Sequence, residues 1–574
     1  MVTWSDVLLW RAAHIETVQD DASAARKAAR EQVQELEAHY NRIASQGLAI
    51  DAMRQALSRV QDELDHAVNA ISAYMLACAE AIDGVRVVEA KVKSALEISE
   101  EIGCTIYDDG SVSIPYVDLS DAVRYGKAAV LQGKYSDLQM CIADALSVAR
   151  KVDEELRRKL QELAEDRFEQ NGPKEGRHSA SPGLPDDADE SWSPSEVSAW
   201  WGALTDEERQ ACIERDPLKY GNLDGIDMAS RDKANRMALY GYDTGGNASI
   251  RLGSTGLLQQ AQDKFDQAQA AYDDCVGAHG LFSDEAMALK VERDRAGRDL
   301  ADLQKIDERL RKGAGEDGEP VSLLALDTSG EQVKAAVAVG DVDHAQHVAN
   351  FTPGMGTNVR DSLDNYVDVA DRMRDNTVEQ ANIEPSDVAV VAWLNYDAPT
   401  DITKTWDTDV ASTEKARAGA DRLAGFLTGV RSWRDEQGGS LHLTSVSHSY
   451  GSTTAGFAMR QMGEGVVDDH IYLASPGSAA YTVGALGVDP SHVWVSAVPE
   501  GDMVQGMGPD VTFGRNPEQL EGIQHLSGDA TGAQGYDPQP SSPVANHSSY
   551  FAPPKPGERN EAFDDVCRVL GGAK

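Results

Sequence analysis

Residues 441–456, LHLTSVSHSYGSTTAG, combine types and spacing suited to nucleophilic chemistry. The alternating apolar residues at the start predict a short buried strand, and the small residues after position 451 can begin a helix. Strand, sharp turn and helix in this order predict a nucleophile elbow with Ser449 at its tip. A serine hydroxyl is a weak nucleophile, so it needs a base and the N–H groups of a helix start beside it. The bland alternative is a structural Ser/Gly-rich turn.

An acyl-transfer site also needs a base and an acid that orients the base. Ser449, Asp502 and His547 follow one another in the order nucleophile, acid, base. Asp502 comes just after a predicted strand, at the end where open α/β sheets place ligand-binding groups. In this hypothesis His547 accepts the Ser449 proton and returns it to the leaving group, while Asp502 holds the imidazole tautomer.

Other residues compete for these two roles. Asp489, Asp510 or Asp529 could be the acid, although each has the setting of a solvated turn carboxylate. His525 could be the base, in a loop rich in Gly, Ser and Asp. His448 lies inside the elbow and would point away from the nucleophile in a standard turn, which favours a packing role.

Two backbone N–H groups are predicted to bind the oxyanion. Residues 352–357, TPGMGT, follow an apolar strand and precede a helical segment. The N–H of Met355 would be one donor, and the N–H of Tyr450, directly after the nucleophile, would be the other. The alternative for residues 352–357 is a plain glycine turn into a helix.

Composition narrows the possible partners and cofactors. The 574 residues carry a net charge of −42, from 95 acidic and 53 basic side chains. This excess of acid argues against nucleic acid or an anionic membrane as a partner. The six cysteines are scattered with no Cys-x-x-Cys pair, so neither a zinc site nor a disulfide framework is predicted. The proposed chemistry needs no metal and no organic cofactor.

The sequence also bears on location. No run approaches the roughly 20 apolar residues that a membrane helix needs, so no transmembrane segment is predicted. The first residues, MVTWSDVLLWRAAHIETVQDD, lack the basic start, long apolar stretch and cleavage site of a secretory signal peptide. We therefore expect a cytoplasmic protein by default, with export by a signal-peptide-independent route remaining open.

Changes in pattern divide the chain into five parts. Residues 1–168 have apolar residues at three- and four-residue spacing, which predicts a helical bundle or coiled-coil domain. Residues 169–192 are polar and rich in Pro, Gly, Ser and Asp, as in a linker. Residues 193–250 predict a helical segment packed on the following domain. Residues 251–318 predict a helical hairpin insertion, either a lid or an elaboration, with the elaboration favoured.

In residues 319–574, short apolar runs alternate with helical segments, which predicts an α/β domain with a mainly parallel sheet. Strands are predicted at residues 321–326, 334–339, 345–351, 388–394, 441–446, 470–474 and 492–498. The elbow, Asp502 and the 352–357 loop then all follow the ends of strands.

Several segments together resemble an actinobacterial α/β-hydrolase family of unknown function. They are WWGAL at 200–204, GNLDG at 221–225 with Arg231 and ANR at 234–236, TPGMGT at 352–357, VAWLNYDAP at 391–399, the elbow, ASPG at 474–477 and HSSY at 547–550. The resemblance implies an α/β-hydrolase fold with Ser449, Asp502 and His547 as the triad, and it implies that the preceding helical segment packs on the core. At Ser447 the family more often has glycine.

Residues 1–168 loosely resemble the helical N-terminal halves of actinobacterial proteins related to type VII secretion substrates. The Tyr-x-x-x-Asp/Glu export signal of those substrates is absent from this region.

From these observations we expect an esterase- or lipase-like serine hydrolase that cleaves a small-molecule or lipid ester through an acyl-enzyme on Ser449. The alternative is a secreted or partner-binding effector. Its helical N-terminal domain would bind a protein and its hydrolase fold would serve as a scaffold.

Overall fold

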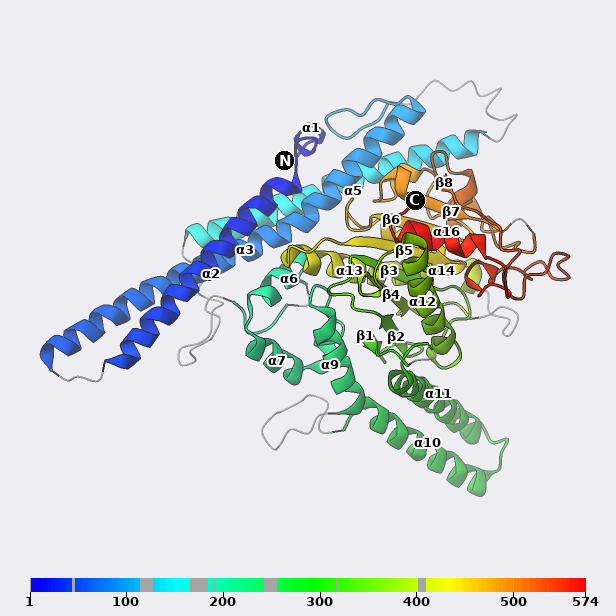
Figure 1. Cartoon of the computed structure of the whole chain (residues 1–574), viewed down its shortest axis with the longest axis horizontal. Coiled ribbons are helices and arrows are strands. Elements are labelled where there is room, and N and C mark those ends of the chain that lie inside the picture. Colours follow the sequence, from blue (N-terminus) through cyan, green and yellow to red (C-terminus); the bar gives the residue numbers. More distant parts are fainter. Residues whose placement is uncertain are drawn as a thin grey trace.

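The computed structural model describes residues 2–43, 47–113, 127–165, 184–189, 191–241, 255–315, 318–400, 409–498 and 500–574. Within these residues an eight-stranded sheet carries helices on both faces, and long helices precede it in the chain (Figure 1). The predicted fold class, a helical region followed by an α/β-hydrolase domain, is confirmed.

The sheet has the strand order β1-β2-β4-β3-β5-β6-β7-β8. β2 runs antiparallel to its neighbours β1 and β4, and every pair from β4 to β8 is parallel. Parallel strands place their carboxyl ends at one edge, so the loops after β3, β5 and β7 meet there. The bounds are β1 Val321–Asp327, β2 Lys334–Val339, β3 His347–Thr352, β4 Val388–Leu394, β5 His442–His448, β6 Asp469–Leu473, β7 Val493–Ser496 and β8 Gln524–His525.

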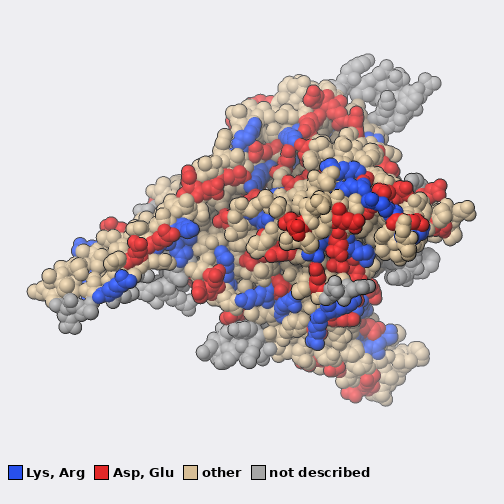
Figure 2. Space-filling model, in the orientation of Figure 1, with Lys and Arg blue, Asp and Glu red and all other residues tan. Residues whose placement is uncertain are grey.

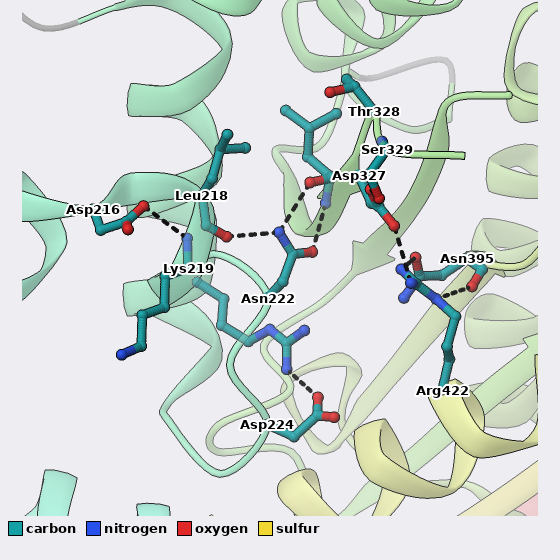
Figure 3. Close-up of a pocket in the computed structure, with 12 residues that line it drawn as sticks. Asp216, Leu218, Lys219, Asn222, Asp224, Asp327, Thr328, Ser329, Asn395 and Arg422 are labelled. Atoms are coloured by element: carbon teal, nitrogen blue, oxygen red, sulfur yellow. Dashed lines mark hydrogen bonds and ion pairs between the residues drawn. The ribbon is translucent and has the colours of Figure 1, made fainter. Parts of the chain in front are cut away.

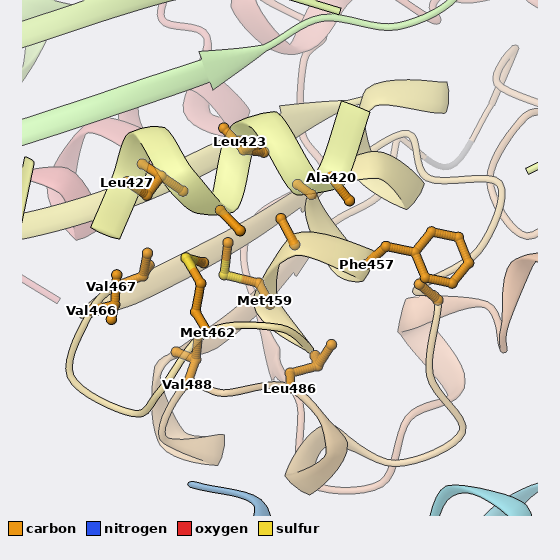
Figure 4. Packing of buried hydrophobic residues seen from close by; sticks show 14 of the residues in the cluster. Ala420, Leu423, Leu427, Phe457, Met459, Met462, Val466, Val467, Leu486 and Val488 are labelled. Atoms are coloured by element: carbon orange, nitrogen blue, oxygen red, sulfur yellow. The ribbon is translucent and has the colours of Figure 1, made fainter. Parts of the chain in front are cut away.

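Helices bury both faces of this sheet. One face lies under α13 (Glu414–Glu436) and α14 (Tyr450–Met459), and the other under α12 (Val359–Ala381) and α16 (Glu561–Leu570). Figure 4 shows the first layer, in which Leu423 and Leu427 of α13 lie beside Met459 and Met462. Because strands covered on both faces bury every side chain, β4 is a continuous apolar run rather than an alternating one.

The N-terminal helices dock on the α13–α14 side. They are α1 Trp4–Val7, α2 Ala12–Arg42, α3 Leu48–Ile102 and α5 Lys127–Ala164. α3 packs against both α2 and α5, and the far ends of α2 and α3 project from the body as a two-helix arm (Figure 1). Near the body, the buried Asp137 of α5 accepts a hydrogen bond from the Tyr481 N–H at 2.7 Å and pairs with Arg460 at 3.2 Å. These helices therefore share one core with the sheet domain.

Residues 193–241 fold into α6 Pro194–Ala203, α7 Asp206–Arg215, α8 Pro217–Tyr220 and α9 Met228–Tyr240, and α9 packs on the edge strand β1. Part of the stretch predicted as a linker, residues 169–192, packs against this segment. Residues 166–183 and 190 lie outside the described residues, but Leu184 and Ala188 are buried beside Trp200, whose indole N–H donates to the Pro185 carbonyl at 2.9 Å. Isolated apolar residues in a polar stretch carry no periodicity, so their spacing does not predict this packing.

The predicted hairpin insertion consists of α10 Leu257–His279 and α11 Asp284–Lys312. It packs on α9, α12 and β1, and its tip points away from the body (Figure 1). β1 is the outermost strand on this side of the sheet, and three strands separate it from β5. This placement favours an elaboration over a lid.

Acidic side chains are spread over the molecule. Figure 2 shows Asp and Glu on the arm, the body and the projecting hairpin, with Lys and Arg interspersed among them. Among the described residues, no helix has the length and apolar character to cross a membrane.

At the sheet edge opposite the carboxyl ends of the parallel strands, a buried carboxylate links three of them. Asp469 at the start of β6 binds His442 of β5 at 2.6 Å, His492 at 2.9 Å and the Trp494 indole N–H of β7 at 2.7 Å. Burial raises the pKa of Asp469, but these hydrogen bonds outweigh it and hold the pKa below 3.8. Burial lowers the pKa of His442, but Asp469 outweighs it and raises that pKa above 6.5.

The two shifts define a pH window. The Asp469 contribution to stability is present above its unfolded-state pKa of about 4 and is lost as the pH falls through the lowered folded-state value. The His442 contribution is present below about pH 6.5 and is lost as the pH rises through the raised folded-state value. Both contributions are therefore present together between about pH 4 and pH 6.5.

We expect Asp469→Asn to lower the free energy of unfolding by about 2–4 kcal/mol at pH 6 and by less at pH 9, because His442 loses its proton as the pH rises through its raised pKa. Urea unfolding at both pH values measures the difference. Asp489→Asn is the control, because Asp489 is a half-exposed turn cap and asparagine caps equally well. Equal losses from Asp469→Asn at the two pH values would contradict the ionic part of this interaction.

Candidate active site

The predicted nucleophile turn is a strained elbow. Ser449 follows β5 directly and precedes α14, with φ 56° and ψ −134°. Non-glycine residues rarely adopt a positive φ and keep it only where the surroundings fix the turn. Here the Ser449 N–H donates to the Leu473 carbonyl of β6 at 3.0 Å, and the residue is 7% exposed.

Close approach of the backbone explains the glycines around this turn. A Cβ on Gly451 would lie 2.3 Å from the Pro353 carbonyl oxygen. A Cβ on Gly354 would lie 2.6 Å from the Ser449 Cβ and 2.9 Å from its Oγ, so the loop after β3 lies against the nucleophile. Ser447, before the turn, is buried, and its hydroxyl donates to the Ile471 carbonyl at 3.0 Å.

Asp502 and His547 lie together at the carboxyl edge of the sheet. His547 Nδ1 is 2.8 Å from Asp502 Oδ1; the aspartate side chain is fully buried and the histidine side chain is 18% exposed. The Tyr550 hydroxyl donates to the second carboxylate oxygen at 2.7 Å. Burial raises the pKa of Asp502, but the hydrogen bonds and charge of His547, together with the Tyr550 hydroxyl, hold it below 3.8. Asp502 is thus an anion that orients the imidazole.

His448 connects this pair to the nucleophile. It is the last residue of β5, and its Nε2–H donates to the main-chain carbonyl of His547 at 2.7 Å. The two imidazole rings lie 4.6 Å apart between centroids. The elbow pattern predicts a packing role for His448. Its ring does pack against Phe551, but it also holds the backbone of His547 beside the elbow.

The rival residues have other partners. The Asp489 carboxylate accepts hydrogen bonds from Ser491, and that of Asp529 from Thr531. Asp510 is exposed in the first turn of a short helix, α15 Asp510–Phe513. His525 is exposed in β8. In the described part of the chain, none of these four side chains is hydrogen-bonded to Asp502 or His547.

Hydrogen bonds on both sides of Met355 hold the loop that carries it. The Tyr396 hydroxyl donates to the Pro353 carbonyl at 2.7 Å, and the Gly356 N–H donates to the Pro399 carbonyl at 2.8 Å. Within the described residues, the Met355 N–H has no hydrogen-bond partner, so it is available to an oxyanion. Tyr450 contributes the first N–H of α14, and its hydroxyl donates to the Ser412 carbonyl at 2.6 Å, which anchors the start of this helix.

A polar pocket of about 700 Å³ lies farther along the same edge, between α8, α9 and the loops after β1 and β4 (Figure 3). Arg422 pairs with Asp327 at 2.9 Å, and Arg231 pairs with Asp224 at 2.8 Å. Ser449 is not among the residues that line it. Because its arginines already have carboxylate partners, the pocket joins the helical segment to the sheet and offers no unpaired charge for chemistry. Elsewhere in the described residues, no group of three or more His, Cys, Asp or Glu side chains has an arrangement that could hold a metal ion.

Comparison with known proteins identifies the family. A family model described as alpha/beta hydrolase matches residues 328–512, which include the elbow and Asp502. The uncharacterized protein Mb0988c of Mycobacterium bovis is 33% identical over 235 residues, 40% of this chain and 83% of that protein. The chain belongs to the alpha/beta hydrolase family.

A longer relative matches more of this chain. The uncharacterized protein Rv2079 of Mycobacterium tuberculosis is 29% identical over 310 residues, 53% of this chain and 42% of that protein. The chain therefore spans about two fifths of the length of that relative. Neither relative's name states a substrate.

Sequence reasoning missed the contacts of Tyr550 and His448 with the acid and the base. Tyr550 lies three residues after His547, in a 3-10 turn, Ser549–Phe551, which places both side chains on Asp502. The HSSY segment at 547–550 is the sequence feature that contains both His547 and Tyr550. Its spacing does not indicate which distant carboxylate these side chains bind.

We expect Gly354→Ala to lower hydrolase activity about 100-fold or more, because the new methyl group would displace either Ser449 or the neighbouring Met355 N–H. Single-turnover kinetics and circular dichroism would separate lost chemistry from lost fold. The control is Gly277→Ala, where an added Cβ meets nothing within 4 Å inside helix α10. Full activity in Gly354→Ala would show that this loop does not approach the nucleophile in solution.

Proposed function

We propose that the protein is a serine hydrolase that cleaves an ester or a related acyl bond through an acyl-enzyme on Ser449. The buried hydrogen bond between His547 Nδ1 and Asp502, next to a strained serine elbow, carries this proposal. Ser449 is the nucleophile, His547 the base and Asp502 the orienting acid. The N–H groups of Met355 and Tyr450 bind the oxyanion.

The reaction proceeds in two halves. Ser449 Oγ attacks the carbonyl carbon while His547 Nε2 takes the hydroxyl proton, and the carbonyl oxygen becomes an oxyanion. Collapse of this intermediate breaks the bond to the alcohol, which leaves with the proton from His547. Water then repeats the sequence on the acyl-enzyme and releases the carboxylic acid and free Ser449. Asp502 stays ionised and stabilises the imidazolium in both halves.

Exposed apolar side chains favour an apolar acyl group. Met503 and Met507 are 62% and 63% exposed on the loop after Asp502, and Val544 is 48% exposed shortly before His547. The Met503 N–H donates to the Pro543 carbonyl at 2.9 Å, which joins the two loops. We call these three exposed apolar side chains the apolar rim. In this proposal the acyl chain bound to Ser449 lies against the rim, so lipid-like esters suit the site better than small polar ones.

Ser449→Ala is expected to abolish hydrolysis of a short-chain p-nitrophenyl ester, with a loss of about 10⁶-fold in kcat where the background allows it to be measured. A fluorophosphonate probe should label the wild-type protein at Ser449 and leave the variant unlabelled. Ser491→Ala, at an exposed turn, is the control. Unchanged turnover or labelling in Ser449→Ala would refute the assignment.

For the wild-type protein, we expect kcat/KM to rise from p-nitrophenyl acetate to the octanoate ester by about 10-fold or more, because each buried methylene contributes up to about 0.8 kcal/mol. The pair Met503→Gln and Met507→Gln should flatten this rise. Leu281→Gln, at the exposed tip of the α10–α11 hairpin, should not. A flat chain-length profile in the wild type would contradict the apolar rim.

The two-helix arm supports a second proposal, binding of a protein partner. Leu48 at its tip is 91% exposed, and Met53 and Val60 are also exposed along α3. If the folded protein does not react with the fluorophosphonate probe, this second proposal is favoured: the arm would bind the partner and the hydrolase fold would serve as a scaffold.

A further inference from the structure

We propose that His448 and Tyr550 are positioning residues that fix the base and the acid relative to the nucleophile, so that the strand carrying Ser449 also sets the place of His547. This inference rests on the proposed function and adds two residues to its machinery. Neither residue touches the substrate in this scheme. Both act through His547 and Asp502.

The hydrogen bond of His448 determines its tautomer. Since the His547 carbonyl can only accept, His448 Nε2 carries the proton and donates at 2.7 Å. The bond goes to the main chain, so it restrains the path of the backbone at residue 547 and leaves the catalytic ring free. His448 is the last residue of β5 and Ser449 is the next in the chain. A shift of the elbow would therefore move the backbone of the base with it.

His448 also has to stay neutral for this role. Burial, and then the nearby charge of His547, lower the pKa of His448 to about 3. A neutral ring can lie 4.6 Å from the His547 ring, between centroids, without opposing the positive charge that His547 gains during the reaction. A second imidazolium at this distance would disfavour that charge.

Tyr550 holds the acid from the opposite side. Its hydroxyl accepts from the Val498 N–H at 2.8 Å and donates to Asp502 Oδ2 at 2.7 Å. Burial raises the pKa of Tyr550 well above 10, so the hydroxyl remains a donor at any working pH. Val498 lies just past β7, and the hydroxyl therefore joins the carboxylate to the end of that strand.

Together the two contacts hold the Asp502–His547 pair between the ends of β5 and β7. His547 is held through its main chain by His448 and through Nδ1 by Asp502, which in turn is held by Tyr550. These contacts limit the rotation of the His547 imidazole. If His448 and Tyr550 only filled space, they would be equally buried, but His448 Nε2 and the Tyr550 hydroxyl would not need to donate hydrogen bonds.

The test compares variants that keep or remove each donor. Tyr550→Phe and His448→Leu remove a hydrogen bond and keep much of the volume, whereas His448→Gln retains an N–H that can reach the carbonyl. Tyr536→Phe is the matched control, because in the described residues its hydroxyl has no hydrogen bond. The measurements are kcat and KM on a p-nitrophenyl ester, the fluorophosphonate labelling rate and the melting temperature of the full chain.

We expect Tyr550→Phe and His448→Leu to lower kcat and the labelling rate about 10- to 100-fold with KM within about twofold of wild type. His448→Gln should recover most of this loss, and Tyr536→Phe should behave as wild type. If His448→Leu does not fold, Tyr550→Phe and His448→Gln still decide the matter.

Wild-type kcat in both Tyr550→Phe and His448→Leu, with Ser449→Ala inactive, would overturn this inference and leave the proposed function intact. An equal loss in His448→Gln and His448→Leu would show that the donor is not what matters at this position. If Ser449→Ala is as active as wild type, the proposed function fails and the positioning roles fail with it.

Discussion

The buried carboxylate of Asp502 is the interaction on which the rest of the site depends. An ionised carboxylate removed from water is stable only when donors surround it, because its desolvation costs several kcal/mol. His547 supplies a donor to one oxygen and Tyr550 to the other, and both come from one short segment of chain. The position of the proposed base is therefore tied to the stability of the fold, since a shift of His547 would remove one donor from a buried carboxylate.

The sheet sets the position of the nucleophile in a different way. β5 lies between β3 and β6, so the chain that leaves its carboxyl end has neighbours on both sides and can continue only through a tight turn. The positive φ of Ser449 costs on the order of 1–3 kcal/mol, which the buried packing of α14 offsets. The same crowding demands glycine at 354 and 451, and it brings the β3 loop to the serine. The strain at Ser449, the glycines beside it and the close approach of the β3 loop are thus consequences of one crowded strand end.

Local patterns explain what the sequence could predict. The mainly parallel sheet follows from apolar runs separated by helical segments, and the elbow follows from small residues around Ser449 at the end of such a run. The order of Ser449, Asp502 and His547 in the sequence predicts that they form one site, and the fold places all three at one edge of the sheet. Their catalytic roles stay a prediction. Distance in sequence explains the rest: Tyr550 meets its carboxylate 48 residues away and His448 meets its carbonyl 99 residues away. No periodicity encodes such contacts, nor the burial of Leu184 and Ala188 in a polar stretch.

Asp502 and His547, the proposed acid and base, lie in loops, so the repeated backbone hydrogen bonds of helices or strands do not hold them in place. Buried asparagines take over that task. The Asn546 amide donates to the carbonyls of Glu500 and Asp537, both at 2.9 Å, and thereby joins the acid loop to the base loop. The Asn560 amide donates to the carbonyls of Ser549 and Ala552 at 2.8 and 2.9 Å and fixes the far side of the turn that carries Tyr550. Each amide side chain mimics a backbone group and satisfies carbonyls that would otherwise be buried without a donor. Precision at a site built from loops thus comes from the same requirement that governs Asp502, that the buried polar groups of the site are paired.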